Sequence, residues 1–395
     1  MLALLILFVI IVVLVRFRMP IGFSLIIGAV FLGIFYFGIG EKFWALLYHS
    51  IISFETWKLV VTVSLILTFA FIFESAGFVE DMVRSLKSFL SPLWVSRIAP
   101  AIIGLLPMPG GAMVSAPIVK LMGEGSDATP EQFTSSNYWW RHVWETTWPL
   151  YPSIILAAAV MRVSVWDVAI INFPISITCI VSGFILKPIG DNLRSSEKFD
   201  ALSLWNSLWP ILFIVVLGLI FKIDIVISVL CVTIVVVLYR HIKLSVIIDG
   251  LKKGFAIDMI ALIFGVMTLM MAIDETGAAS RFYEELMIAH VPAWLAVYTV
   301  PFVVGVLAGI TSAYIGVGFP IVFPLIGTAT LSHNAGLLLA FAGGYMGVMI
   351  SPVHLCLVLT AQYFKASLWK SIFLILIPVI LTSIISFILA FTLYR

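Results

Sequence analysis

The chain repeats itself, and this repeat restricts its possible folds more than any other feature. With a constant shift of 201 positions, Glu74, Pro100 and Gly104 recur as Glu275, Pro301 and Gly305. After a two-residue insertion the shift is 203, and it pairs Pro117-Ile118-Val119 with Pro320-Ile321-Val322, Pro149 with Pro352, Arg162 with Lys365, Ser164 with Ser367 and Trp166 with Trp369. Apolar segments that Pro or Gly interrupts at matching places in two halves are typical of secondary transporters, whose substrate site lies where the halves meet. We therefore predict two structural repeats.

Composition places the repeats in a membrane. Hydrophobic residues make up 62% of the chain and charged residues 11%, and apolar runs of about 17–25 residues recur along its length. These features predict an all-α polytopic membrane protein surrounded by the lipid bilayer. The net charge of +2 gives no reason to expect a nucleic-acid partner. Cys179, Cys231 and Cys356 are odd in number and widely spaced, so they suggest neither a disulfide framework nor a metal site, and we expect them to be small buried residues.

Each half is predicted to contain five membrane spans, the fourth of them interrupted. We assign residues 1–190 to the first repeat, 191–202 to a connector and 203–395 to the second repeat. The leading apolar run is followed by Arg16 and Arg18, so we interpret it as a span and not as a cleaved signal. The predicted spans are 1–16, 20–39, 57–75, 133–162 (interrupted) and 165–187, then 203–221, 223–240, 257–275, 335–364 (interrupted) and 368–393.

Between the third and fourth spans of each half lies an apolar stretch that is broken near its centre. We predict re-entrant helical hairpins at about 95–122 and 293–328, with their tips at 107–111 and 309–318. Proline removes a backbone donor and glycine permits unusual backbone angles, so each cluster ends one short helix and allows another to begin. Two ordinary kinked spans are the alternative.

The distribution of Lys and Arg tests this topology. Six of the 22 Lys and Arg residues fall on one side, Arg141 lies within a span, and the remaining fifteen fall on the other side. The positive-inside rule then predicts an inner-membrane protein with both termini outside the cytoplasm. An odd number of spans per repeat makes the repeats inverted, and amphipathic stretches at 78–89 and 279–290 are expected along opposite interfaces. The six residues on the minority side are Lys42, Lys58, Arg162, Lys222, Arg281 and Arg395.

Helices that break inside a membrane offer free N–H groups and a positive dipole end to an anion. The four predicted breaks are the two hairpin tips and the interruptions of the fourth spans at 144–152 and 343–354, and they indicate a binding site for a small anionic substrate. His354 aligns with Tyr151 in the other repeat; it contacts substrate or a proton, or it is a hydrogen-bonded core histidine. The candidate substrate-binding residues are Pro109, Gly110, Gly111, Arg141, His142, Thr311, Ser312, Ser351 and His354.

Glu145 is the acidic residue at the centre of the first interrupted span, and two interpretations of it stay open. It carries a coupling proton or helps to bind a cation, or it only neutralises Arg141, four residues earlier on one helical face. Thr146, Thr147 and Ser115 are further candidate coupling residues. Hydroxyl oxygens and backbone carbonyls can hold sodium, which we place near Ser115, Thr146, Thr311 and Ser351; no other cofactor is expected.

These motifs resemble those of the ion-transporter superfamily, which contains divalent-anion/sodium symporters, gluconate permeases and dicarboxylate carriers. The runs Pro-Met-Pro-Gly-Gly-Ala at 107–112 and Ser-Pro-Val-His-Leu-Cys at 351–356 are similar to those of an uncharacterised prokaryotic integral membrane protein family within it. The resemblance implies a homodimeric elevator in which hairpins and broken spans move against a scaffold. It implies a sodium- or proton-coupled transporter of a carboxylate or sugar acid, and family sodium symporters carry Ser-Asn-Thr motifs where this chain has Pro109-Gly110-Gly111 and Thr311-Ser312-Ala313. An exporter or an anion channel of the same fold is the alternative, and the absence of a recognisable catalytic motif argues against an enzyme.

Overall fold

The computed structural model describes residues 2–108, 110–191, 201–327 and 331–394. Helices account for the regular structure of this part of the chain, and no β-strand occurs in it. The expectation of an all-α protein is therefore confirmed. The helices of the first half are α1 (Leu2–Arg16), α2 (Ile21–Phe37), α3 (Glu41–Ile52), α4 (Phe54–Ser75), α5 (Phe78–Phe89), α6 (Pro92–Ile103), α7 (Ala112–Met122), α8 (Pro130–His142), α9 (Pro152–Met161) and α10 (Val165–Gly183).

The helices of the second half follow the same order, but the second arm of its hairpin, residues 311–325, is irregular. Its helices are α11 (Ala201–Val215) with the π-helical turn η1 (Val216–Ile220), α12 (Ile225–Tyr239), α13 (Leu244–Gly254), α14 (Ile257–Thr276), α15 (Ala278–Ile288) and α16 (Ala293–Ala308). They continue with α17 (Thr311–Ala313), the π-turn η2 (Tyr314–Gly318), α18 (Phe319–Val322), the 3-10 turn η3 (Phe323–Leu325), α19 (His333–Met349), α20 (Leu355–Phe364) and α21 (Leu368–Thr392).

Helix boundaries agree with the repeat at several places where local sequence decides them. Helices α9 and α20 are both ten residues long and start 203 positions apart. Both end in a left-handed residue, Arg162 with φ 57° and Lys365 with φ 56°, a conformation that closes helices by turning the chain away from the axis. The two halves therefore share the positions of these helix caps as well as the sequence matches. The division of the chain into domains stays a prediction.

Four helical segments of the described chain are long and apolar enough to cross a bilayer: Phe54–Ser75, Val165–Gly183, Leu244–Thr276 and Leu368–Thr392. The other apolar helices are 10–17 residues long, shorter than the roughly 20 residues that a straight crossing requires. The short helices α6, α7, α9, α16 and α20 fit the predicted hairpins and interrupted spans. Helices α1, α2 and α12 correspond to predicted complete spans and are 15, 17 and 15 residues long. The chain is a membrane protein by this composition, although which compartment each end faces stays a prediction.

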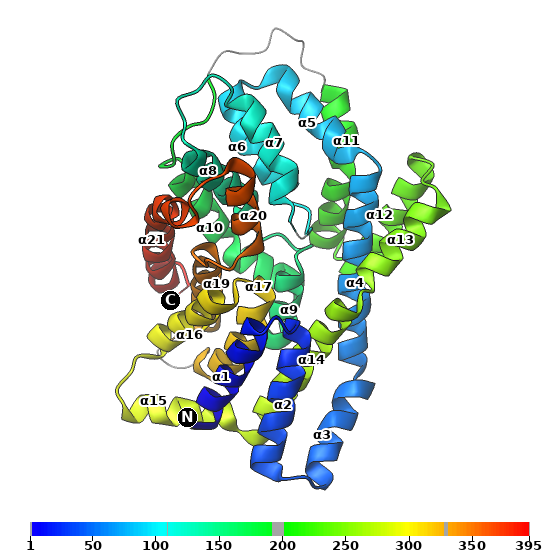
Figure 1. Ribbon diagram of the computed structural model, residues 1–395. Helices are drawn as coiled ribbons and strands as arrows, with labels where there is room; N and C mark the ends of the chain where they lie inside the picture. The colour runs from blue at the N-terminus through cyan, green and yellow to red at the C-terminus, as the bar shows by residue number, and fades with distance from the viewer. Residues whose placement is uncertain (1, 109, 192–200, 328–330, 395) are drawn as a thin grey trace.

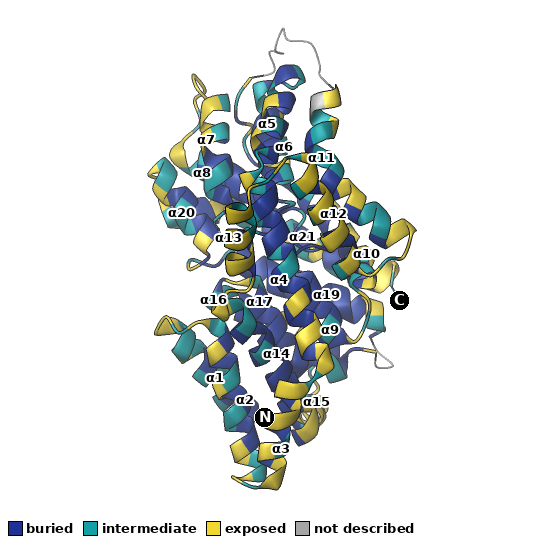
Figure 2. Cartoon of the chain, turned by 90° about the vertical axis from the view of Figure 1, so that its right-hand side faces the viewer, coloured by how far each residue is buried: buried dark blue, intermediate teal, exposed yellow. Residues whose placement is uncertain are grey.

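Helices from the two halves pack in matching pairs. Helix α2 packs against α14, and its counterpart α12 packs against α4, the counterpart of α14. The final helices α10 and α21 contact each other. The amphipathic helices α5 and α15 lie at opposite ends of the molecule, as Figures 1 and 2 show. This placement is what an inverted pair of repeats requires.

A glycine face on α19 brings it into close contact with α16. A Cβ atom on Gly343 would collide with the backbone of Tyr298, one on Gly347 with that of Phe302, and one on Gly344 with the ring of Tyr314. Small residues spaced four apart allow backbones in membranes to approach closely. The break expected from residue 343 onward is therefore wrong in its first part, because α19 continues to Met349 and uses these glycines for packing.

Candidate functional site

Two interrupted spans meet near the centre of the molecule. Helix α8 ends at His142 and α9 starts at Pro152, where proline occupies the first helical position. Helix α19 ends at Met349, and α20 starts at Leu355. Each break leaves one helical C-terminus and one N-terminus, which carry partial negative and positive charge. Such a centre offers places for both an anion and a cation.

Arg141 occupies this centre and is held by neutral groups. Its Nη1 donates to the Tyr151 hydroxyl at 2.9 Å and its Nη2 to the Leu106 carbonyl at 3.1 Å. The side chain is 2% exposed, and its Nε has no hydrogen-bond partner. Tyr151 in turn donates to the Gly104 carbonyl at 2.6 Å. The guanidinium is thus buried and oriented, and its Nε is still free to donate.

Gly111, at the tip of the first hairpin, lies directly against this guanidinium. A Cβ atom at Gly111 would collide with the Arg141 Nη2 and would lie 2.9 Å from its Nε. Gly110 has a φ of 71°, a left-handed angle that glycine adopts without strain. The predicted tip therefore does contact the predicted arginine. Pro109, the third candidate of this tip, lies outside the described residues.

His142 and His354 come from different repeats and face each other. Their Nε2 atoms are 3.3 Å apart. The Nδ1 of His142 hydrogen bonds to the Tyr138 carbonyl at 2.6 Å, and the Nδ1 of His354 to the Gly309 carbonyl at 2.7 Å. The two rings are 3% and 8% exposed. His354 is thus a hydrogen-bonded histidine that also lies beside His142, another candidate site residue.

Glu145 is buried, but it does not pair with Arg141 in the way that the i,i+4 spacing suggests. Helix α8 ends at His142, so Glu145 lies in the following turn and not on the helical face of Arg141. Among the described residues no direct ion pair joins the two, and one carboxylate oxygen of Glu145 has no hydrogen-bond partner. Thr311 lies near the Glu145 side chain. Whether Glu145 neutralises Arg141 from this turn or carries a coupling ion stays a prediction.

The candidate hydroxyls divide between the two sides of the site. Ser351 donates to the Val306 carbonyl at 2.7 Å, beneath Gly309. Thr146 bonds Ser176 at 2.9 Å and Thr147 donates to the Ala169 carbonyl at 2.5 Å, so both face α10. Ser115 donates to the Ala112 carbonyl of its own helix at 3.2 Å. A hydroxyl that donates its proton keeps lone pairs that can bind a cation. Thr146 faces α10, however, whereas Ser351 faces α16. The sodium site stays a prediction.

The second hairpin reaches the centre through its irregular arm. Helix α16 ends at Ala308 and is capped by Gly309, which has a φ of 64°, and Thr311 and Ser312 start the short α17. The π-turn η2 follows and places Tyr314 in the core with an unpartnered hydroxyl. Helices α17, α18 and η2 contact α9. Thr311 and Ser312 therefore belong to a segment that packs against the first interrupted span.

Several contributors were missed in the sequence. Tyr345, in the second repeat, donates a hydrogen bond of 2.5 Å to the His142 carbonyl. This bond gives a partner to the carbonyl of the last residue of α8, in the first repeat. Tyr151 holds Arg141, and Cys356 lies beside the two histidines. The shift of 203 pairs Tyr345 with His142 and Tyr151 with His354, so reading the repeat outward from the histidines would have found both tyrosines.

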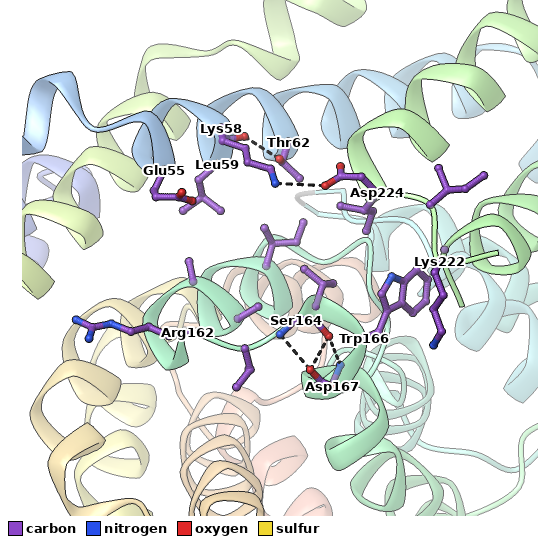
Figure 3. A pocket seen from close by; sticks show the side chains of 18 of the residues that line it. Glu55, Lys58, Leu59, Thr62, Arg162, Ser164, Trp166, Asp167, Lys222 and Asp224 are labelled. Atoms are coloured by element: carbon purple, nitrogen blue, oxygen red, sulfur yellow. Dashed lines mark hydrogen bonds and ion pairs between the residues drawn. The ribbon is translucent and has the colours of Figure 1, made fainter. Parts of the chain in front are cut away.

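A separate open cleft of about 800 Å³ lies beside α9. Figure 3 shows Lys58 and Asp224 along one wall and Ser164 and Asp167 along the opposite wall. Lys58 and Asp224 form an ion pair of 3.3 Å, and Arg162 pairs with Asp274 at 2.5 Å. Lys222 also lines the cleft. The basic residues here are three of the six that the charge count assigns to the extracytoplasmic side, so the predicted topology places this cleft on that side of the membrane. The cleft lies beside α9, and none of the candidate site residues lines it.

Comparison with known proteins gives a family and a fold. No curated protein matches this sequence. The solved structure of the YdaH transporter from Alcanivorax borkumensis, described as having an unusual topology, is similar with a TM-score of 0.63. The match covers 89% of this chain and 88% of YdaH at 13% sequence identity, which shows a shared fold. Residues 1–393 match the family described as "Protein of unknown function (DUF401)", and the chain therefore belongs to that family.

Proposed function

We propose that the protein is a secondary active transporter of a small organic anion, a carboxylate or a sugar acid. The observation that carries this proposal is Arg141, a guanidinium 2% exposed, held only by a carbonyl and a phenol, with its Nε free. A buried cation without a close counter-charge is costly in a membrane protein, and such residues mark substrate pathways. A carboxylate is the natural partner of guanidinium, since it accepts two parallel N–H bonds.

The broken helices support the same ligand. The N-terminal ends of α9 and α20 add partial positive charge at the centre. At the hairpin tip, the backbone of Gly110-Gly111 lies next to Arg141, and no side chain of these glycines separates the two. An anion here would be held by backbone N–H groups and by the guanidinium, with His142, His354, Ser351, Thr311 and Ser312 around it.

Transport requires this centre to open to each side in turn. We propose an elevator mechanism in which the hairpins and interrupted spans move against a scaffold that contains α4, α12 and α14. The cleft between α4 and the α9–α10 connection lies along that division. The fold shared with the YdaH transporter supports a transport role. Membership of the ion-transporter superfamily, a homodimer, an inner-membrane location and coupling to sodium or protons are parts of the same proposal.

Uptake into reconstituted vesicles tests the proposal. Vesicles would be screened with carboxylates and sugar acids under imposed sodium or proton gradients. Arg141→Met should weaken substrate affinity by about 10- to 100-fold, the cost of losing a charge-assisted hydrogen bond. Arg97→Met is the matched control, because Arg97 is also a buried arginine but packs among the rings of Trp94, Trp140 and Phe184. Equal affinities in the two variants would remove Arg141 from the substrate site.

The same vesicles separate the alternatives. An exporter of this fold would accumulate substrate only when inserted in the opposite direction, and a channel would pass ions far faster than a carrier. Conversion of substrate during the assay would show an enzyme. Failure of every carboxylate and sugar acid to bind, measured as the absence of any thermal stabilisation of the purified protein, would contradict the organic-anion proposal.

A further inference from the structure

A cluster of one thiol and two imidazoles lies between the repeats. The ligand atoms of His142, His354 and Cys356 all lie within 4.8 Å of one another. Both histidines are buried, and Cys356 is 9% exposed. The three residues come from two chain segments that are more than 200 positions apart in sequence. We propose that this cluster binds a transition-metal ion of the Zn²⁺ type. Both histidines also border the proposed anion site, but the metal proposal does not rest on anion transport.

The hydrogen bonds of the two histidines fix which nitrogens are available. A backbone carbonyl only accepts, so the Nδ1 atoms that bond Tyr138 and Gly309 must carry protons. In the neutral rings, both Nε2 atoms then present lone pairs, and these face each other at 3.3 Å. Two lone pairs at this distance repel each other. A positive species between them removes the repulsion, and a metal ion does so for both rings together.

The geometry suits zinc. Two nitrogens bound to Zn²⁺ at about 2.0–2.1 Å in a tetrahedral arrangement lie about 3.3–3.4 Å apart. The Nε2 atoms already have this separation. The Cys356 thiol sulfur lies within 4.8 Å of a ring nitrogen of each histidine, near enough to move into the coordination sphere of an ion held between them. Metal-binding histidines commonly donate their other ring N–H to a backbone carbonyl, as both do here.

Charges of both signs surround the cluster. It lies between the C-terminal end of α8, which carries partial negative charge, and the N-terminal end of α20, which carries partial positive charge. Glu145, buried and with one oxygen unpartnered, and Arg141 act on His354 with opposite signs. The Cys356 thiolate and the Glu145 carboxylate would together neutralise a Zn²⁺ ion, and Arg141 would leave one positive charge beside it. Three protein ligands leave the fourth coordination position open.

Metal binding by the full-length purified protein tests this proposal. The detergent-solubilised protein would be stripped with a chelator and titrated with Zn²⁺ against a chromophoric competitor, and with Co²⁺ for spectroscopy. We expect one ion per chain and a thiolate-to-cobalt charge-transfer band. Cys356→Ser should abolish the band and weaken Zn²⁺ binding by at least about 100-fold, since even the loss of an outer-shell partner costs about 10- to 100-fold.

Cys179→Ser is the control, because Cys179 is also a buried free thiol but lies outside the cluster. It should keep both the band and the affinity. If His142→Ala or His354→Ala fails to fold, the Zn²⁺-induced rise in unfolding temperature, expected in the wild type and absent in Cys356→Ser, decides the question. Wild-type protein that binds no Zn²⁺, or Cys356→Ser protein that binds it as tightly, would overturn the site; the pair would then share a proton instead.

Discussion

At the scale of single residues, a substitution of Glu145 distinguishes its two possible roles, which are to carry a coupling ion and to neutralise Arg141. Since it forms no ion pair with Arg141, Glu145→Gln should leave expression and unfolding temperature nearly unchanged. If Glu145 is a coupling group, the variant should exchange substrate across vesicles but lose accumulation driven by a sodium or proton gradient. Paired exchange and gradient-driven uptake assays measure both. A neutralising role predicts a different result, in which Glu145→Gln is unstable and adding Arg141→Met restores stability.

At the scale of elements, the contact between α16 and α19 depends on glycines whose hydrogen atoms leave room for the opposing backbone. A Cβ atom on Gly347 would meet the carbonyl of Phe302. Gly347→Ala should therefore destabilise the protein by about 1–3 kcal/mol, the usual cost of overpacking. Thermal unfolding in detergent measures this. Gly40→Ala is the control, because the nearest atom to its added Cβ is 3.8 Å away and its backbone angle is ordinary. Equal unfolding temperatures would contradict close packing at Gly347.

At the scale of the whole molecule, the predicted inversion of the second repeat relative to the first determines which parts of the protein should face the same compartment. Ser126 follows α7, and His290 follows α15; both are exposed. In a variant that lacks the exposed Cys231, a cysteine at 126 should react with a membrane-impermeant reagent only from the cytoplasm, and one at 290 only from outside. Intact and inside-out vesicles measure this. Labelling of both from one side would show that the repeats are parallel.

Local signals made much of this fold predictable, and long-range contacts account for what was missed. Ser164 and Asp167 form a reciprocal cap that starts α10, and Pro152 starts α9, so their boundaries could be inferred from neighbouring residues. Gly343 and Gly344 were misread because glycine serves both broken backbone and close packing. Cys356 gave no signal, because its partner His142 is more than 200 residues away and only folding brings them together.

The sealed centre has a kinetic consequence. Arg141, His142, Glu145 and His354 are each 2–8% exposed, and the open cleft stops beside α9. A ligand therefore cannot reach them by diffusion alone. Its observed association rate should level off as concentration rises, at the rate constant with which the hairpins part from the broken helices. Turnover of such a protein is set by how often it opens, however tightly its centre holds the ligand.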